Sequence, residues 1–114
     1  MTGSPQTGRA AADLFEQLDA RLLSQPHVEQ GTGFGRMPGL RTNKRIFAML
    51  CRGELVVELP RARVDELVAA GAAMRFEPRR DGRLMKEWAT LPEEQNHNWE
   101  PLAREALQFV SVAT

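Results

Sequence analysis

Two apolar runs separated by Arg52-Gly53 constrain the fold of this chain most strongly. Residues 45–51 (RIFAMLC) and 54–59 (ELVVEL) are rich in large and β-branched apolar side chains, which is typical of β-strands. A connection this short forces the two strands to be antiparallel. The sequence therefore predicts a β-hairpin, and we expect a three-residue loop, Cys51-Arg52-Gly53, with Gly53 in the left-handed conformation.

Neither face of this hairpin is clearly polar, so both faces need cover from water. We expect the chain itself to cover most of the second face, with a partner protein as the alternative, because monomers seldom expose large apolar patches. A three-residue loop sets the register of the two strands and so decides which side chains share a face of the hairpin. One predicted face holds Phe47, Met49, Leu55, Val57 and Leu59, and the second holds Ile46, Ala48, Leu50 and Val56.

Helical periodicity predicts three helices around the hairpin. In residues 9–25, Leu14, Leu18 and Leu22 recur at steps of four and form one apolar stripe, which ends before Pro26. Residues 60–70 and 99–112 also carry apolar stripes and are the expected middle and C-terminal helices. Further expected strands are an extended segment at 28–40 and two short strands at 74–76 and 84–91.

This order of elements predicts an α+β fold, an antiparallel sheet with N-terminal, middle and C-terminal helices packed on it. With 114 residues the chain has the length of one domain, which we expect to span 9–114 after a disordered tail at 1–8. The single cysteine, Cys51, excludes an internal disulfide and favours a reducing, cytoplasmic environment. No apolar run is long enough to span a membrane.

The sequence offers little catalytic or metal-binding chemistry, and we expect neither an enzyme nor a cofactor. His27 and His97 have no cysteine or histidine at ligand spacing. Cys51 is better explained as a small buried apolar residue than as a nucleophile. The glycines of 31–35 (GTGFG) do not follow the dinucleotide-binding pattern and are better explained by close backbone approach in a strand.

Basic residues are concentrated in the middle of the chain, although lysine plus arginine equals aspartate plus glutamate at 15 each. Residues 36–86 hold twelve basic and six acidic residues, a net charge of +6. The two ends of the chain can fold back and neutralise this segment, or two basic hairpin tips can contact nucleic-acid phosphates. The candidate nucleic-acid contacts are Arg41, Lys44 and Arg45 at one tip and Arg79, Arg80 and Arg83 at the other.

Strand and turn patterns over about residues 10–112 resemble the small bacterial proteins described as TfoX amino-terminal-domain-like and MmcQ/YjbR-like. The resemblance is carried by Phe34-Gly35, Gly39-Leu40, Asn43-Lys44 with Phe47-Ala48, residues 54–60 (ELVVELP), and 85–88 (MKEW). It implies a compact α+β fold with helices on an antiparallel sheet, a link to the regulation of competence, and DNA binding through paired wings. It supplies no catalytic residues.

We expect a non-enzymatic cytoplasmic binding or regulatory module that acts through protein contacts, including self-association. The candidate partner surface is Ile46, Leu50 and Val56 on the second hairpin face. The alternative is a nucleic-acid-binding protein that uses the two basic tips. A third hypothesis is a small-ligand carrier or enzyme with a pocket near 31–35 and Trp88.

Overall fold

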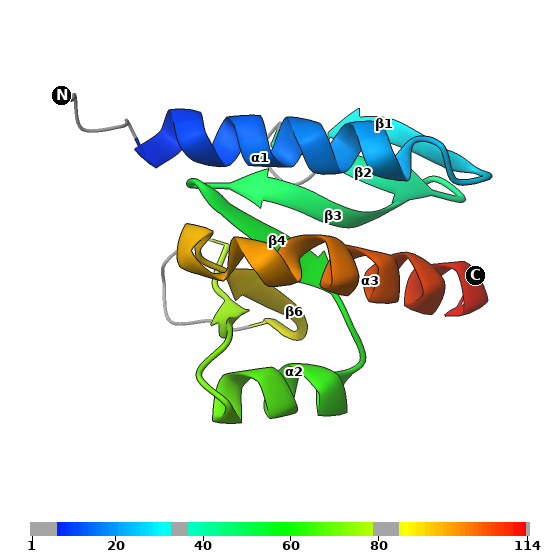
Figure 1. The fold of residues 1–114 in the computed structure, drawn as a ribbon. Coiled ribbons are helices and arrows are strands. Elements are labelled where there is room, and N and C mark those ends of the chain that lie inside the picture. Colours follow the sequence, from blue (N-terminus) through cyan, green and yellow to red (C-terminus); the bar gives the residue numbers. More distant parts are fainter. Residues whose placement is uncertain (1–6, 33–36, 79–84, 114) are drawn as a thin grey trace, which may run out of the picture.

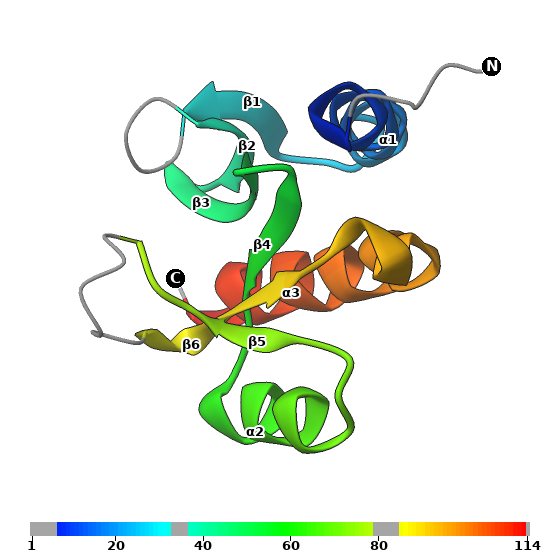
Figure 2. The ribbon, with the colours of Figure 1, turned by 90° about the vertical axis from the view of Figure 1, so that its left-hand side faces the viewer.

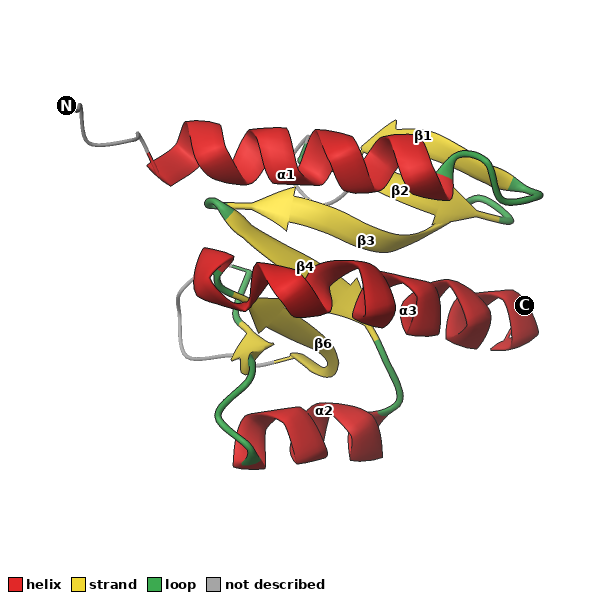
Figure 3. Cartoon of the chain, viewed as in Figure 1, coloured by secondary structure: helices red, strands yellow, loops and turns green. Residues whose placement is uncertain are grey.

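The chain folds into a six-stranded antiparallel sheet with helices packed on it, in a computed structural model that describes residues 7–32, 37–78 and 85–113. The strand order is β1-β2-β3-β4-β6-β5 (Figure 1). The predicted α+β class and its three helices are confirmed (Figure 3). The elements are α1 (Thr7–Leu22), β1 (Val28–Thr32), β2 (Pro38–Thr42), β3 (Arg45–Cys51), β4 (Glu54–Glu58), α2 (Arg61–Ala69), β5 (Met74–Phe76), β6 (Met85–Leu91), the short 3-10 helix η2 (Glu93–Asn98) and α3 (Trp99–Ala113).

The helices pack on one face of the sheet and form the main core with it. α1 and α3 lie on the same side of the strands, and α2 contacts β5 and β6 at the far end (Figures 1 and 2). The predicted stripe of α1 faces this core, with Leu18 and Leu22 buried and Leu14 partly buried. Each fully buried side chain of this size contributes about 1.5–3 kcal/mol to the free energy of unfolding.

The opposite face of the sheet holds a second, smaller apolar cluster. Met49 and Val56 are fully buried there, and Phe76 and Trp88 are nearly so. Ile46 packs against them and is partly buried. The expectation that the chain itself covers much of this face is therefore confirmed for these strand residues.

The hairpin of β3 and β4 has a different register from the predicted one. Cys51 pairs with Glu54, so the loop has two residues, Arg52 and Gly53, and both have positive φ, at 53° and 77°. A left-handed arginine is unusual, but its guanidinium donates hydrogen bonds to two carbonyl oxygens of residues 77–78 and lies over the Phe76 ring. These contacts offset the free-energy cost of the positive φ at Arg52, which makes Arg-Gly an unusual two-residue loop.

The predicted division of side chains between the two hairpin faces was wrong as a result. Met49 pairs with Val56, and both lie in the second cluster, whereas Ala48 pairs with Val57 in the main core. A β-bulge where β3 meets β2 adds Phe47 to the main core, because Leu40 pairs with Ala48 and the next residue of β2 already pairs with Ile46. The side chains of β3 therefore do not alternate strictly between the two faces of the sheet.

Close backbone approach is found at Gly39 rather than at Gly31, the one glycine of 31–35 that lies in the described part of the chain. Gly31 and Gly39 pair with each other across β1 and β2. A Cβ on Gly39 would lie 2.9 Å from the carbonyl oxygen of Ala48, and a Cβ on Gly31 would lie 3.0 Å from Cδ of Arg41. The missing side chains let β3 and the Arg41 stem approach closely, whereas residues 33–36 lie outside the described part of the chain.

Candidate functional site

The first predicted basic tip, Arg41, Lys44 and Arg45, lies at the turn between β2 and β3. Asn43 and Lys44 both have positive φ and form a two-residue turn. Arg41 and Arg45 are bound within the fold, to Glu29 at 3.1 Å and to Glu58. Lys44 is the basic side chain of this tip that has no ion pair among the described residues. The second predicted tip, Arg79, Arg80 and Arg83, lies outside the described residues.

The ion pair of Arg45 with Glu58 lies in a hollow on the second face of the sheet. Nε of Arg45 donates to Oε1 of Glu58 at 3.1 Å, and Nη2 donates to Oε2. The hollow has a volume of about 510 Å³ and includes Thr32, Lys44 and Trp88 in its lining. It adjoins the site of the third hypothesis, and both oxygens of its carboxylate accept hydrogen bonds from the arginine.

The candidate partner surface does not form one patch. Val56 is fully buried in the second cluster, and Ile46 is half-buried beside it. Leu50 packs against the main core on the opposite face of the sheet. The two-residue loop is the physical reason, because it places Leu50 opposite Leu55 rather than beside Val56.

Ion pairs also tie the basic middle of the chain to its acidic ends. Arg63 of α2 binds Glu105 of α3 through Nε at 3.0 Å and Nη2 at 3.1 Å, and it binds Glu66 through Nη1 at 3.0 Å. Arg41 binds Glu29 in the same way, whereas the pair of Arg75 in β5 with Asp65 in α2 lies within the middle segment. Hydrogen bonds to Glu105 and Glu66 raise the pKa of the Arg63 guanidinium above its ordinary value. The mixed charges at these positions fit a fold in which the ends neutralise the middle.

An apolar groove lies beside this ion pair, between α2 and α3. Its volume is about 520 Å³, and its lining includes Leu59, Pro60, Phe109 and Val112. Val112 is 81% exposed and Phe109 is half-buried. Arg63 and Glu105 line the same groove and give it charged positions beside the apolar ones. The groove therefore combines apolar side chains with one ion pair.

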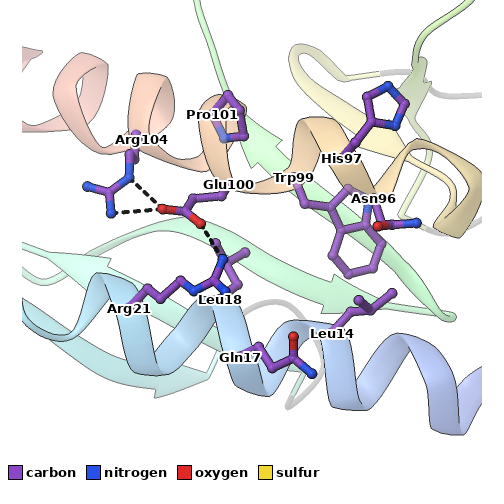
Figure 4. Close-up of a pocket in the computed structure, with 10 residues that line it drawn as sticks. All are labelled: Leu14, Gln17, Leu18, Arg21, Asn96, His97, Trp99, Glu100, Pro101 and Arg104. Carbon is purple, nitrogen blue, oxygen red and sulfur yellow. Dashed lines mark hydrogen bonds and ion pairs between the residues drawn. The ribbon is translucent and has the colours of Figure 1, made fainter.

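A second groove lies between α1 and the start of α3, with a volume of about 550 Å³. Figure 4 shows the Glu100 carboxylate between the guanidinium groups of Arg21 and Arg104. Trp99 and Leu14 lie further along the groove. Hydrogen bonds from Arg21 and from Arg104 hold the pKa of the Glu100 carboxyl below its ordinary value. This site was not predicted from the sequence, although the spacing of Glu100 and Arg104 is that of a helical ion pair.

Among the described residues, no three histidine, cysteine or carboxylate side chains gather where they could hold a metal ion. Cys51 is buried in the second cluster. Within the described ranges, each helix is too short or too polar to cross a bilayer. No family model, curated protein or solved structure matches this chain.

Proposed function

We propose that this chain is a non-enzymatic binding and regulatory module that recognises a protein partner through the groove between α2 and α3. The observation that carries the proposal is the apolar surface of that groove. Val112 is 81% exposed beside the exposed Pro60 and the half-buried Phe109, whereas Leu59 of the same lining is buried. An exposed apolar side chain in a partly apolar groove favours contact with another protein.

The side chains that line the groove indicate which side chains a partner would need. Its apolar side chains would cover those of an apolar segment of the partner, and the neighbouring Arg63 and Glu105 would meet polar groups at the edge of that segment. We propose a different protein rather than a second copy as the occupant. A second copy is an outcome that the experiment below distinguishes.

Two further observations support a binding rather than a catalytic role. Both carboxylate oxygens of Glu58 accept hydrogen bonds from Arg45, so the structure supplies this buried carboxylate with an internal ion-pair partner. The thiol of Cys51 is buried among apolar side chains. A buried single thiol also suits the cytoplasm, where we propose that the protein acts. The α+β fold agrees with the proposed membership of the TfoX amino-terminal-domain-like and MmcQ/YjbR-like proteins.

The experiment compares the partners of three forms of the full chain. Wild type, Val112→Asp and Met74→Asp are immobilised at equal density, and retained proteins are measured by quantitative mass spectrometry. Met74 is 69% exposed on β5 and is a matched control for adding a charge at an exposed apolar position. We expect a protein that wild type and Met74→Asp retain equally and that Val112→Asp loses. Equal retention by all three forms, or self-association that Val112→Asp abolishes, would contradict the proposal.

A second candidate function, nucleic-acid binding, is favoured by one specific observation. Within the described part of the chain, Lys44, Arg61 and Lys86 have no ion pair, and all three line hollows that also include Trp88. These cations differ from the predicted Arg41 and Arg45, which are paired internally. Their combined change to glutamine should abolish a salt-sensitive mobility shift of DNA or RNA if this function holds. No shift of either nucleic acid by wild type at low salt would exclude it.

A further inference from the structure

The groove between α1 and α3 has an unequal number of opposite charges. Nη1 of Arg21 donates to Oε1 of Glu100 at 2.7 Å. Nε and Nη2 of Arg104 donate to Oε2 of Glu100 at 3.0 Å and 2.9 Å. Two guanidinium groups therefore share one carboxylate, and the cluster carries a net charge of +1 at neutral pH. One arginine is enough to tie α1 to α3, so the second leaves a surplus of positive charge.

The ion-pair cluster between α2 and α3 has the opposite stoichiometry. There Arg63 is shared by Glu66 and Glu105, which gives that cluster a net charge of −1. The two clusters both join a helix to α3, so a role in packing alone does not distinguish them. Of the two clusters that join a helix to α3, only the one that contains Arg21 and Arg104 has a surplus of positive charge.

Both arginines keep hydrogen-bond donors for a ligand. Within the described ranges, Nε and Nη2 of Arg21 and Nη1 of Arg104 have no protein acceptor. The side chains are 63% and 43% exposed, so an anion can reach these donors from solvent.

Beyond this cluster the groove is lined by polar and apolar side chains, with His97 and Asn96 among the polar ones. Leu14 and Leu18 of α1 line it, together with Trp99 and the amide of Gln17. A volume of about 550 Å³ is enough for a small organic molecule rather than for an isolated ion. The groove therefore combines donors for one anionic group with apolar surface for the body that carries it.

We propose that this groove binds a small organic anion, whose carboxylate or phosphate group contacts Arg21 and Arg104 and whose apolar body lies toward Leu14 and Trp99. Charge-assisted hydrogen bonds from arginine suit both anionic groups. The proposal is independent of partner binding between α2 and α3. Its charged residues Arg21, Glu100 and Arg104 are not among the candidate site residues predicted from the sequence.

The test is a titration of the isotope-labelled full chain, followed by amide chemical shifts. The probes are phenyl phosphate, benzoate, inorganic phosphate and, as the neutral control, benzyl alcohol. We expect saturable shifts around Arg21 and Glu100 with the two aromatic anions, weaker shifts with inorganic phosphate and none with benzyl alcohol. The affinities of phenyl phosphate and benzoate are compared, and the higher one shows which anionic group the site prefers.

Three variants separate binding from packing. Arg104→Gln keeps the contact of Arg21 with Glu100 and should weaken binding about fivefold or more, because one charged donor group is lost. Glu100→Gln should tighten binding, because the competing carboxylate charge is removed; a purely structural cluster would not produce this gain. Arg41→Gln, which removes another arginine with an exposed ion pair that lies outside the groove, is the matched control and should leave binding unchanged. Absence of saturable shifts in wild type, or equal affinity in Arg104→Gln and Glu100→Gln, would overturn the proposal.

Discussion

Arg45 of β3 binds the buried carboxylate of Glu58 in β4, with Nε of the arginine 3.1 Å from Oε1. The glutamate side chain is only 5% exposed, whereas that of the arginine is 41% exposed. An arginine that the sequence marks as a candidate nucleic-acid contact is thus the partner of a buried charge. Its removal should therefore affect stability.

Arg45→Met should lower the free energy of unfolding by about 2–3 kcal/mol, because it leaves a buried carboxylate unpaired. The partly exposed arginine places this value below that of a fully buried pair. Arg41→Met is the matched control, since its partner Glu29 is 63% exposed, and should cost about 1 kcal/mol or less. Urea denaturation of the three proteins measures both values. Equal losses of the free energy of unfolding in the two variants would show that the buried Glu58 carboxylate does not need its ion pair with Arg45.

Gly39→Ala should be more destabilising than Gly31→Ala. The new Cβ at residue 39 would meet the backbone carbonyl of Ala48 at 2.9 Å, so β2 and β3 must separate. At residue 31 the nearest atom is Cδ of the flexible Arg41 side chain at 3.0 Å, which can move. We expect a loss of about 1–3 kcal/mol for Gly39→Ala, the range for overpacking, and a smaller loss for Gly31→Ala. The reverse order in urea denaturation would contradict the described register of β1 to β3.

The second apolar cluster should contribute to stability as a core does. Met49→Ala removes a fully buried side chain and should cost about 2–5 kcal/mol. Met74→Ala removes a side chain that is 69% exposed and should change the free energy of unfolding by about 0.5 kcal/mol or less. Thermal unfolding followed by circular dichroism compares the two. A small effect of Met49→Ala would mean that this face of the sheet is open to water.

The stability contributed by Glu100 should depend on pH in one direction. Arg21 and Arg104 lower the pKa of its carboxyl in the folded state, so the folded protein binds a proton there less readily than the unfolded chain. The contribution is complete above the unfolded pKa of about 4.3 and is lost as pH falls through the lower folded pKa. The stability advantage of wild type over Glu100→Gln should therefore shrink below about pH 4.3 in urea denaturation series. An advantage that stays constant to lower pH would contradict the assignment.

Much of the fold is predictable from local sequence patterns. The stripe of Leu14, Leu18 and Leu22, Pro60 before α2, and the apolar runs of β3 and β4 each depend on residues close together in the chain. The two-residue loop at Arg52-Gly53 was missed because its stability depends on carbonyl groups of residues 77–78, about 25 residues away. The bulge at Phe47 depends in the same way on the neighbouring strand β2.

The candidate sites are less predictable, because they depend on contacts between distant residues. Glu100 and Arg21 are 79 positions apart, and no local pattern marks them as partners. Arg63 and Glu105 are 42 positions apart. Basic residues at 41 and 45 have the composition of a nucleic-acid contact, and only the three-dimensional arrangement reveals their internal partners. The sequence identifies the charged residues, whereas the fold determines which of them are paired internally and which can bind a ligand or a partner.

Site-specific photo-crosslinking in living cells tests the central claim, a protein partner in the groove between α2 and α3, most directly. A photoreactive amino acid replaces Val112 in one protein and Met74 in another, because both positions are exposed and only the first lines the groove. The account predicts one dominant adduct with a different protein from position 112 and none of that adduct from position 74. The same adducts from both positions, or none from position 112, would contradict it.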